Sequence, residues 1–482
     1  MSEFEMTIGG EAVASEGTFT VINPATGEGF AEAPSCTRAQ LDAAFDAAAK
    51  AGAGWSGDEG ARRDALRRIA EQLFAQAESL APVLTAEQGK PLQDANFEIF
   101  GAAMWCQYFA ELDLAPEVIQ DDGSALVEVH RRPVGVVAAI TPWNFPLLLG
   151  FWKLAPALLA GNTVVLKPSP YTPLSTLKVG QLLAECLPPG VANVVSGGDE
   201  LGAWMTAHPT PRKVSFTGSI ATGKKVAMSA APDLKRVTLE LGGNDAAIVL
   251  DDADPALVGR ALFAGAFANN GQVCSAIKRV YVPEALEGPI VEALAACATS
   301  VTVGDGTDPA TKLGPINNAP QFERVRSLVA DALSGGAAAA AGGQAIDRPG
   351  YFFEPTILTG LTEAATIVAE EQFGPALPVL TYRHVDEAVE RANGTRFGLS
   401  GSVWSADEDR AAAIAARLEC GTAWVNTHLA LGPSQPFGGA KWSGVGIENG
   451  PWGLAEFTEV QTIYRSRTGT GLNPTSAAGL LD

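Results

Sequence analysis

Hydrophobic and polar positions follow two different periods along the chain, and each period predicts a different kind of element. Apolar residues recur every three to four positions over residues 38–80 and 93–112, which predicts amphipathic helices. Residues 125–133 alternate apolar and polar side chains, as a half-buried strand does. A fully apolar run at residues 134–140 is typical of a strand buried inside a parallel sheet.

Strand-like and helix-like segments then alternate regularly, which predicts a doubly wound parallel sheet with helices on its faces. The expected strands of this first unit lie at residues 134–140, 163–167, 191–196, 212–216 and 236–241. The expected helices between them lie at residues 147–159, 173–186, 200–208 and 222–230.

A second α/β unit follows the first along the chain. Its expected strands lie at residues 280–282, 356–358, 377–382, 401–404 and 422–425. Its expected helices lie at residues 385–393 and 407–418. Residues 125–133 and 459–466 are two further strands outside both units, and such strands often form an edge that pairs with another subunit.

Composition and charge narrow the class of protein. The chain has 482 residues, of which 47% are hydrophobic, enough for the cores of two or three domains. Its net charge of −21 argues against nucleic acids and anionic membranes as partners. No apolar run approaches the ~20 residues that span a bilayer, and the first residues do not look like a signal peptide.

The cysteines indicate a cellular compartment and one candidate for chemistry. Six are scattered along the chain without paired spacing, which suits a reducing cytoplasm, and we expect the protein there. None of the four histidines is near a cysteine in sequence, so no metal site is expected. Cys274 differs from the other cysteines because it follows the polar, glycine-bearing turn Asn-Asn-Gly-Gln-Val at residues 269–273.

A carboxylate upstream complements this cysteine. Glu240 stands between two leucines, and apolar surroundings raise the pKa of a carboxyl group toward neutrality, as a general base requires. A thiolate at Cys274 could attack a carbonyl carbon, and a base at Glu240 could activate water to release the product. The pair therefore suggests a covalent thioester mechanism.

Four weaker signals follow, and three of them lie at the ends of expected strands, where α/β sheets bind ligands. Asn144 follows the first strand, and its side-chain amide could stabilise an oxyanion. Lys167 ends the second strand, and it could hydrogen-bond a ribose. Residues 216–224 form a glycine-containing strand-to-helix turn that could face a phosphate, although its spacing matches neither the usual dinucleotide fingerprint nor a P-loop. Residues 370–375 combine two glutamates with a phenylalanine.

These motifs, in this order and together with Pro-Phe-Gly-Gly-Ala-Lys-Trp-Ser-Gly at residues 436–444, resemble the aldehyde dehydrogenase superfamily over essentially the whole chain. The resemblance implies a non-acylating enzyme that oxidises an aldehyde to a carboxylic acid with NAD(P). It also implies an α/β fold with three parts. These are a dinucleotide-binding domain at residues 1–120 and 134–243, a catalytic domain at 244–440, and an oligomerisation element at 121–133 and 455–482.

The resemblance further implies a role for each motif residue. Cys274 would be the nucleophile and Glu240 the general base, and Asn144 would form an oxyanion hole with the backbone N–H of Cys274. The implied cofactor-binding residues are Thr141, Trp143, Lys167, Ser169, Gly218, Ser219, Leu241, Glu371 and Phe373. The implied substrate funnel consists of Phe145, Leu149, Trp152, Val273, Leu431 and Phe437.

One departure from the family pattern bears on the choice of cofactor. Pro170 stands where many NAD-preferring members have a glutamate that repels a 2′-phosphate, so we expect NAD to be preferred and NADP accepted.

The substrate, the assembly and the reaction class are further expectations. Because the funnel residues are all uncharged, we expect an apolar aldehyde. A homodimer or a homotetramer is expected. The alternatives are a dehydrogenase that acylates coenzyme A and a non-catalytic protein on the same scaffold, but acylating members typically lack the glutamate found here at Glu240.

Overall fold

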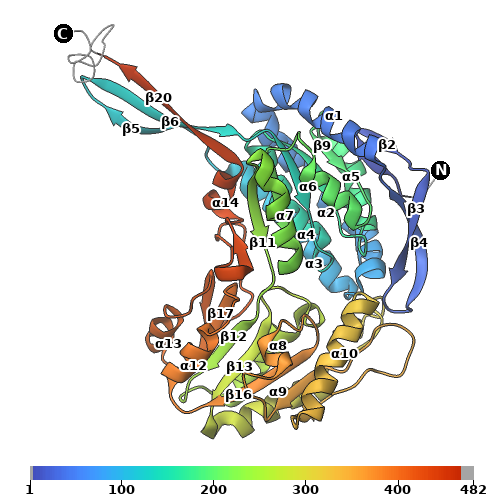
Figure 1. Cartoon of the computed structure of the whole chain (residues 1–482), viewed down its shortest axis with the longest axis vertical. Coiled ribbons are helices and arrows are strands. Elements are labelled where there is room, and N and C mark those ends of the chain that lie inside the picture. The colour runs from blue at the N-terminus through green and yellow to red at the C-terminus, as the bar shows by residue number, and fades with distance from the viewer. Residues whose placement is uncertain (1–3, 468–482) are drawn as a thin grey trace.

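The computed structural model describes residues 4–467, and the expected tail after Ser466 lies mostly outside these residues. Two α/β lobes lie one above the other, and a narrow β arm projects from the upper lobe (Figure 1). The α/β class with parallel-sheet domains is thus confirmed. Within the described residues, no helix is both long enough and apolar enough to cross a membrane.

The upper lobe is built on an eight-stranded sheet whose five central strands are parallel. The strand order is β19-β11-β10-β7-β8-β9-β1-β2. The strands are β1 (Met6–Ile8), β2 (Glu11–Val13), β7 (Val136–Ile140), β8 (Thr163–Lys167), β9 (Ala192–Val194), β10 (Lys213–Thr217), β11 (Arg236–Glu240) and β19 (Gly444–Val445). β1, β2 and β19 are added antiparallel at the two edges.

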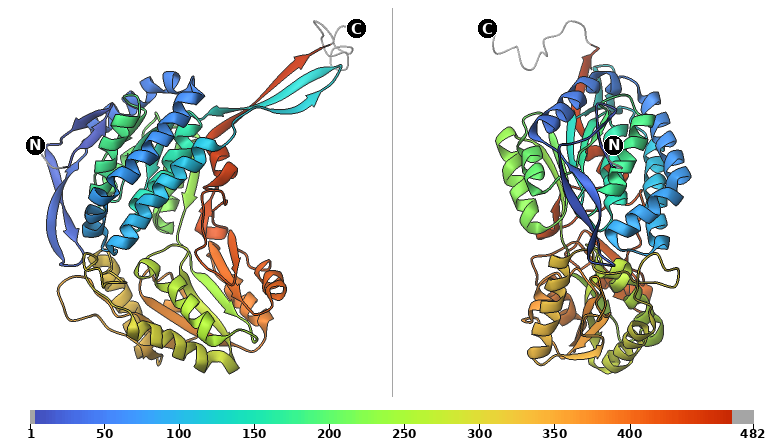
Figure 2. Two further views of the ribbon diagram at one scale, coloured as in Figure 1. Left: turned by 180° about the vertical axis from the view of Figure 1, so that it is seen from behind. Right: turned by 90° about the vertical axis from the view of Figure 1, so that its right-hand side faces the viewer.

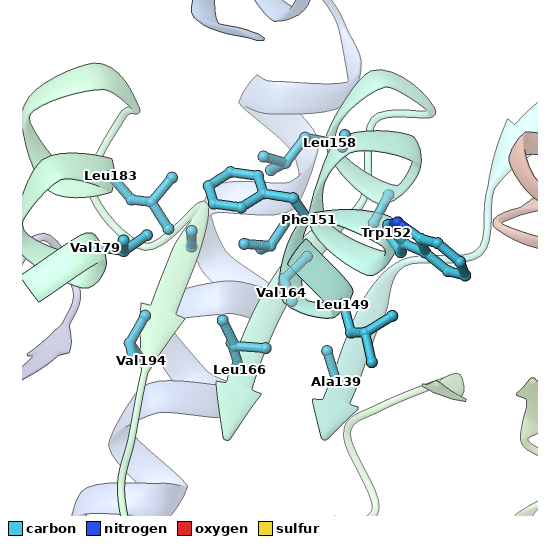
Figure 3. Close-up of a cluster of buried hydrophobic side chains, with 14 of the residues drawn as sticks. Ala139, Leu149, Phe151, Trp152, Leu158, Val164, Leu166, Val179, Leu183 and Val194 are labelled. Carbon is cyan, nitrogen blue, oxygen red and sulfur yellow. The ribbon is translucent and has the colours of Figure 1, made fainter. Parts of the chain in front are cut away.

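Helices cover both faces of this sheet. One face carries α2 (Glu59–Gln88), α3 (Leu92–Glu111), α4 (Pro146–Leu159) and α5 (Leu174–Cys186). The other face carries α1 (Arg38–Ser56), α6 (Asp199–Ala207) and α7 (Ile220–Ala230). Figure 3 shows apolar side chains of α4, including Leu149 and Phe151, beside Ala139 and Val164 of the sheet, whereas Trp152 points away from this cluster. Burial of such apolar surface stabilises the lobe.

The lower lobe contains a seven-stranded sheet, parallel except for β14. The strands, in sheet order, are β14 (Ala338–Ala341), β15 (Thr356–Thr359), β16 (Ala376–Tyr382), β13 (Ile277–Pro283), β12 (Asp245–Val249), β17 (Ser400–Trp404) and β18 (Thr422–Val425). The helices that follow β12 in the chain are α8 (Pro255–Phe267), α9 (Glu287–Ser300), α10 (Ala319–Ser334), α11 (Thr366–Ala369), α12 (Val385–Asn393), α13 (Glu408–Ala415) and α14 (Gly450–Glu456).

The projecting arm is a three-stranded antiparallel sheet. It consists of β5 (Glu117–Asp121), β6 (Ala125–Pro133) and β20 (Thr458–Ser466), with β6 in the middle. The two strands expected outside both α/β units, at residues 125–133 and 459–466, therefore pair with each other, from Pro133 opposite Thr458 to Ala125 opposite Ser466. Figure 2 shows that the arm stands away from both lobes, which leaves β5 and β20 as its edges. A separate hairpin of β3 (Gly17–Asn23) and β4 (Glu28–Ser35) lies along the opposite side of the molecule.

Most predicted strands and helices are present within a few residues, but three points need correction. The helix expected over residues 38–80 is two helices, because Asp58 caps a new helix at the N–H of Ala61 (2.9 Å), and that helix continues to Gln88. β12 was not predicted, although it lies inside the second sheet, because no helix separates it from β11. Residues 117–120, expected in the first domain, belong to the arm through β5.

Candidate active site between the lobes

The chain passes from the upper sheet to the lower sheet within four residues, and a cavity lies at this crossing. β11 ends at Glu240 and β12 begins at Asp245. The cavity has a volume of about 470 Å³ and is lined from both lobes. The sequence-predicted residues among its lining are Trp143, Asn144, Gly218, Ser219, Glu240, Leu241, Cys274, Glu371 and Phe373. Segments far apart in sequence thus converge on one site.

The turn before Cys274 has an unusual backbone. Asn269, Asn270 and Gly271 all have positive φ values, of 47°, 58° and 75°. Asparagine and glycine are the residues that tolerate this left-handed conformation best. A Cβ atom at Gly271 would lie 2.3 Å from the carbonyl oxygen of Gly374, so a larger residue does not fit there. The local sequence is therefore suited to a turn that presents Cys274 to the cavity.

Burial and negative charge act against ionisation of the two reactive groups. Burial, followed by the charge of Glu240, raises the pKa of the Cys274 thiol well above its ordinary value, and Lys278 opposes this effect. Burial also raises the pKa of Glu240 well above its ordinary value, with Glu448 adding to the shift and Lys153 opposing it. One Oε atom of Glu240 is buried without a protein partner, so the carboxyl group is free to meet a water molecule.

Asn144 contacts the segment that bears the cysteine. Its Nδ2 donates to the carbonyl oxygen of Gln272 at 2.9 Å. An amide nitrogen has two hydrogens, so one further donor is available to an oxygen in the site. The backbone carbonyl of Asn144 accepts hydrogen bonds from Lys90 (2.8 Å) and from the side chain of Asn269 (3.1 Å). These contacts fix the amide relative to the cysteine turn.

A second group of predicted residues lies beside the cavity, at the carboxyl ends of β7 and β8. Lys167 is buried, and burial lowers its pKa to about 8. The hydroxyl group of Thr141 is buried without a protein partner. Ser169 accepts a hydrogen bond from the N–H of Tyr171 at 3.3 Å. These three residues do not line the cavity itself, but a polar edge with an unpaired hydroxyl is suited to hydroxyl-bearing ligands such as a ribose.

The N-terminus of α7 faces the cavity through the turn after β10. Ser219 caps this helix by accepting from the N–H of Thr222 at 3.2 Å. A Cβ atom at Gly218 would lie 2.6 Å from the ring of Phe216, which explains the glycine. A helix N-terminus with free N–H groups attracts anionic groups such as phosphates.

Glu371 and Phe373 reach the cavity from the lower lobe. Glu371 accepts a hydrogen bond from the N–H of Gly243 at 3.1 Å, so it contacts the crossing between the lobes. Phe373 has a positive φ of 52° and meets the ring of Trp143 edge to face, with 5.2 Å between centroids. The two rings provide apolar walls against which a flat ring could pack.

The predicted funnel residues form part of the apolar packing of the upper lobe. Trp152 stacks on Trp105 at 5.6 Å and meets Phe437 edge to face at 5.4 Å. Phe145 lies under the ammonium group of Lys90, which is 3.8 Å from the ring centroid. The other predicted members are Leu149, Val273 and Leu431, of which the first two are buried. None of the six is among the residues that line the cavity, so the funnel stays a prediction.

Comparison with known proteins identifies the family. The model of the aldehyde dehydrogenase family matches residues 12–463. This chain belongs to the aldehyde dehydrogenase family. It is 39% identical to retinaldehyde dehydrogenase 3 of Homo sapiens over 455 residues, which cover 92% of this chain and 89% of that protein. It is 38% identical to betaine aldehyde dehydrogenase of Cereibacter sphaeroides over 464 residues, 95% of this chain and 94% of that protein.

Solved structures agree with this assignment. The NAD⁺ complex of an aldehyde dehydrogenase from Bacillus cereus superposes with a TM-score of 0.94 at 36% identity and covers 96% of each chain. A putative aldehyde dehydrogenase from Burkholderia cenocepacia superposes with a TM-score of 0.95 at 37% identity, covering 98% of this chain and 99% of that one. The resemblance inferred from the motifs is confirmed, and aldehyde oxidation is the reaction class.

Two charged residues of this aldehyde dehydrogenase escaped the sequence prediction. Lys153 and Glu448 form a buried ion pair of 2.6 Å, and Lys153 also donates to the hydroxyl of Thr217 at 2.7 Å. Both act on the pKa of Glu240. A signal for Lys153 was present, since it is the one charged residue within the apolar helix α4. Glu448 gave none, because it lies 295 positions away and only the fold brings the two together.

Proposed function

We propose that this aldehyde dehydrogenase oxidises an apolar aldehyde to the carboxylic acid, with NAD as the hydride acceptor and a thioester on Cys274 as the intermediate. The main support is that a thiol, a carboxyl group and an amide donor line one cavity although they come from three distant segments: Cys274, Glu240 and Asn144. Acyl transfer requires these three groups together, namely a nucleophile, a base and an oxyanion donor.

Each group has one chemical task. The thiolate of Cys274 attacks the aldehyde carbon, a C–S bond forms, and the carbonyl electrons move onto the oxygen. The free hydrogen on Asn144 Nδ2 and the N–H of Cys274 stabilise this oxyanion. NAD, when bound, supplies the acceptor for the hydride that leaves the tetrahedral carbon. Glu240 then removes a proton from water, the resulting hydroxide attacks the thioester, and the C–S bond breaks to release the acid.

The residues at the upper edge of the cavity fit a dinucleotide. The unpaired hydroxyl of Thr141 and the ammonium of Lys167 suit ribose hydroxyl groups, and the α7 N-terminus at Ser219 suits a pyrophosphate. The rings of Trp143 and Phe373 suit a nicotinamide. The NAD⁺ complex of the Bacillus cereus relative supports NAD as the preferred cofactor. NADP is proposed as a weaker alternative, because proline at residue 170 bears no charge to repel the 2′-phosphate.

An apolar aldehyde suits the funnel better than an anionic one. The aromatic contacts of Trp152 with Trp105 and Phe437 provide flat apolar walls. The nearby ammonium of Lys90 is fully buried and pairs with Glu98, so it is not available to a substrate carboxylate. Burial of an unpaired carboxylate is costly, which disfavours semialdehydes that bear a second acid group.

The exposed arm and the free cysteines bear on the assembly of the protein and its cellular location. The edge strands of the arm expose Val118, Ile119, Val460 and Tyr464, and such edges favour pairing with a second copy in a homodimer or homotetramer. Light scattering coupled to size-exclusion chromatography tests this assembly. All six cysteines are free thiols, which supports the cytoplasm as the location.

Replacement of the nucleophile provides the direct test of the reaction. Cys274→Ala should abolish NADH formation from benzaldehyde, whereas Cys420→Ala should retain it. Cys420 is a suitable control because it is also half-buried, yet it donates to the carbonyl of Thr422 in the lower lobe, away from the cavity. Normal turnover by Cys274→Ala would refute the thioester mechanism. Formation of acyl-coenzyme A by the wild-type enzyme would support the acylating alternative.

A further inference from the structure

A buried lysine holds the turn that bears the nucleophile. Lys278 is the second residue of β13, and only 2% of its surface is exposed. Its ammonium group turns back and donates to three main-chain carbonyls, those of Val273 (2.6 Å), Cys274 (3.3 Å) and Ala276 (3.3 Å). A lysine has three N–H donors, so this turn uses its whole donor capacity.

The carbonyl of Cys274 is held from two sides. Lys278 approaches it from within the lower lobe, and Gly243 packs against it from the crossing between the lobes. A Cβ atom added to Gly243 would lie 2.6 Å from this carbonyl oxygen. Rotation of the peptide after Cys274 would therefore break its contact with the Lys278 ammonium group, and Gly243 leaves little free space beside this carbonyl.

The surroundings of this ammonium are mainly acidic. The charged and titratable groups that interact with it are Asp245 at the start of β12, Glu371 after α11, His428 after β18 and Cys274 itself. Burial lowers the pKa of His428 to about 3, so this imidazole is neutral near pH 7. Within residues 4–467, the hydrogen bonds of the ammonium group all go to the cysteine turn, and it forms no direct ion pair with a carboxylate.

This charge has a consequence for the thiol. The carboxylates of Glu240, Glu371 and Asp245 each raise the pKa of Cys274, in addition to the larger effect of burial. Lys278 is the cation that lowers it. A cysteine nucleophile reacts as the thiolate, and a nearby cation raises the fraction that is ionised. Without this lysine, the thiol would face three acids with no compensating charge from its own turn.

We propose that Lys278 is a positioning residue for the nucleophile: its ammonium group fixes the orientation of residues 273–276 and supplies the positive charge that allows Cys274 to ionise among carboxylates. The inference rests on the proposed function, in which Cys274 is the nucleophile, and it adds a residue that acts through the cysteine. Lys278 does not line the cavity, so its removal should change thiol reactivity through the cysteine turn.

The test measures thiol reactivity directly, without aldehyde or cofactor. Purified full-length enzyme is treated with iodoacetamide between pH 6 and 10, and alkylation of the peptide that contains Cys274 is followed by mass spectrometry. Because the pKa of the Cys274 thiol lies well above its ordinary value, the readout is the alkylation rate at each pH, and Lys278→Gln should react about tenfold more slowly than the wild type throughout this range. Lys278→Arg, which keeps the charge, should retain alkylation rates close to those of the wild type.

A matched control separates this effect from the loss of any buried lysine. Lys235 is also buried and donates to two main-chain carbonyls, those of Thr206 (2.8 Å) and His208 (2.7 Å), far from the cavity lining. Lys235→Gln should leave the Cys274 profile unchanged. An unchanged profile in folded Lys278→Gln would overturn the proposal. If that variant does not fold, Lys278→Arg decides: alkylation tenfold slower than in the wild type despite the retained charge would equally overturn the proposal.

Failure of this inference and failure of the proposed function are distinguishable. If alkylation of Cys274 leaves aldehyde oxidation intact, then Cys274 is not the nucleophile and the proposed function is wrong. If alkylation abolishes oxidation while Lys278→Gln keeps the wild-type profile, the nucleophile stands and only the role of Lys278 is refuted.

Discussion

Replacement of Glu240 by glutamine separates the two halves of the reaction. Glu240 is 2% exposed, and one of its oxygens has no protein partner, so a glutamine of the same shape fits with little disturbance. The substitution removes the ability to accept a proton from water but leaves Cys274 and Asn144 in place. Thiohemiacetal formation and oxidation should proceed, whereas hydrolysis of the thioester should slow. General-base catalysis typically contributes ~10²–10⁴-fold, so steady-state kcat should fall by this factor, about 3–5 kcal/mol in activation free energy.

Stopped-flow absorbance of NADH provides the assay. Glu240→Gln should give a burst of about one NADH per active site, followed by a slow linear phase, which is the kinetic signature of an accumulated acyl-enzyme. Glu456→Gln, on α14 and away from the cavity, should behave like the wild type. Because the pKa of Glu240 is raised and only its ionised form is a base, wild-type kcat should increase with pH through this raised pKa. The variant should lose this dependence. Full turnover without a burst in Glu240→Gln would refute the assignment of the base.

Three further predictions concern the cofactor, the substrate and the stability of the cysteine turn. NAD should be preferred over NADP by less than about a thousandfold, ~4 kcal/mol, and Pro170→Glu should widen this preference; a larger wild-type ratio of dissociation constants would mean that another group excludes the phosphate. Benzaldehyde and hexanal should have higher kcat/KM values than succinate semialdehyde, and a tenfold advantage for the semialdehyde would indicate a cation in the funnel. Gly271→Ala should lower the free energy of unfolding by at least ~2 kcal/mol in urea titrations, because φ is +75° and the new Cβ would meet Gly374. Gly52→Ala is the control: this residue lies inside α1 with open space around it, so the substitution should raise the free energy of unfolding by about 0.5–1 kcal/mol.

The sequence alone predicted much of the fold and the reaction class, because these depend on local patterns. A buried parallel strand must be apolar throughout, so β7 and β8 were recognisable within two residues. The turn before Cys274 was recognisable because asparagine and glycine, which favour a left-handed backbone, follow one another there. The family motifs are likewise short segments whose residue types follow from the chemistry that they perform.

Tertiary structure decided what depends on contacts between distant segments. β12 was missed because the sequence has no helix to mark the change of sheet after Glu240, and only the packed lobes reveal that the chain crosses there. Lys153 in a helix and Glu448 almost 300 positions later each read as ordinary charged residues until the fold buries them together. Lys278 precedes the strand expected at residues 280–282, and nothing in the sequence marked it for a role. Its role requires the three-dimensional turn, since the energetic effect of a buried charge depends on which atoms surround it and not on which residues are adjacent in sequence.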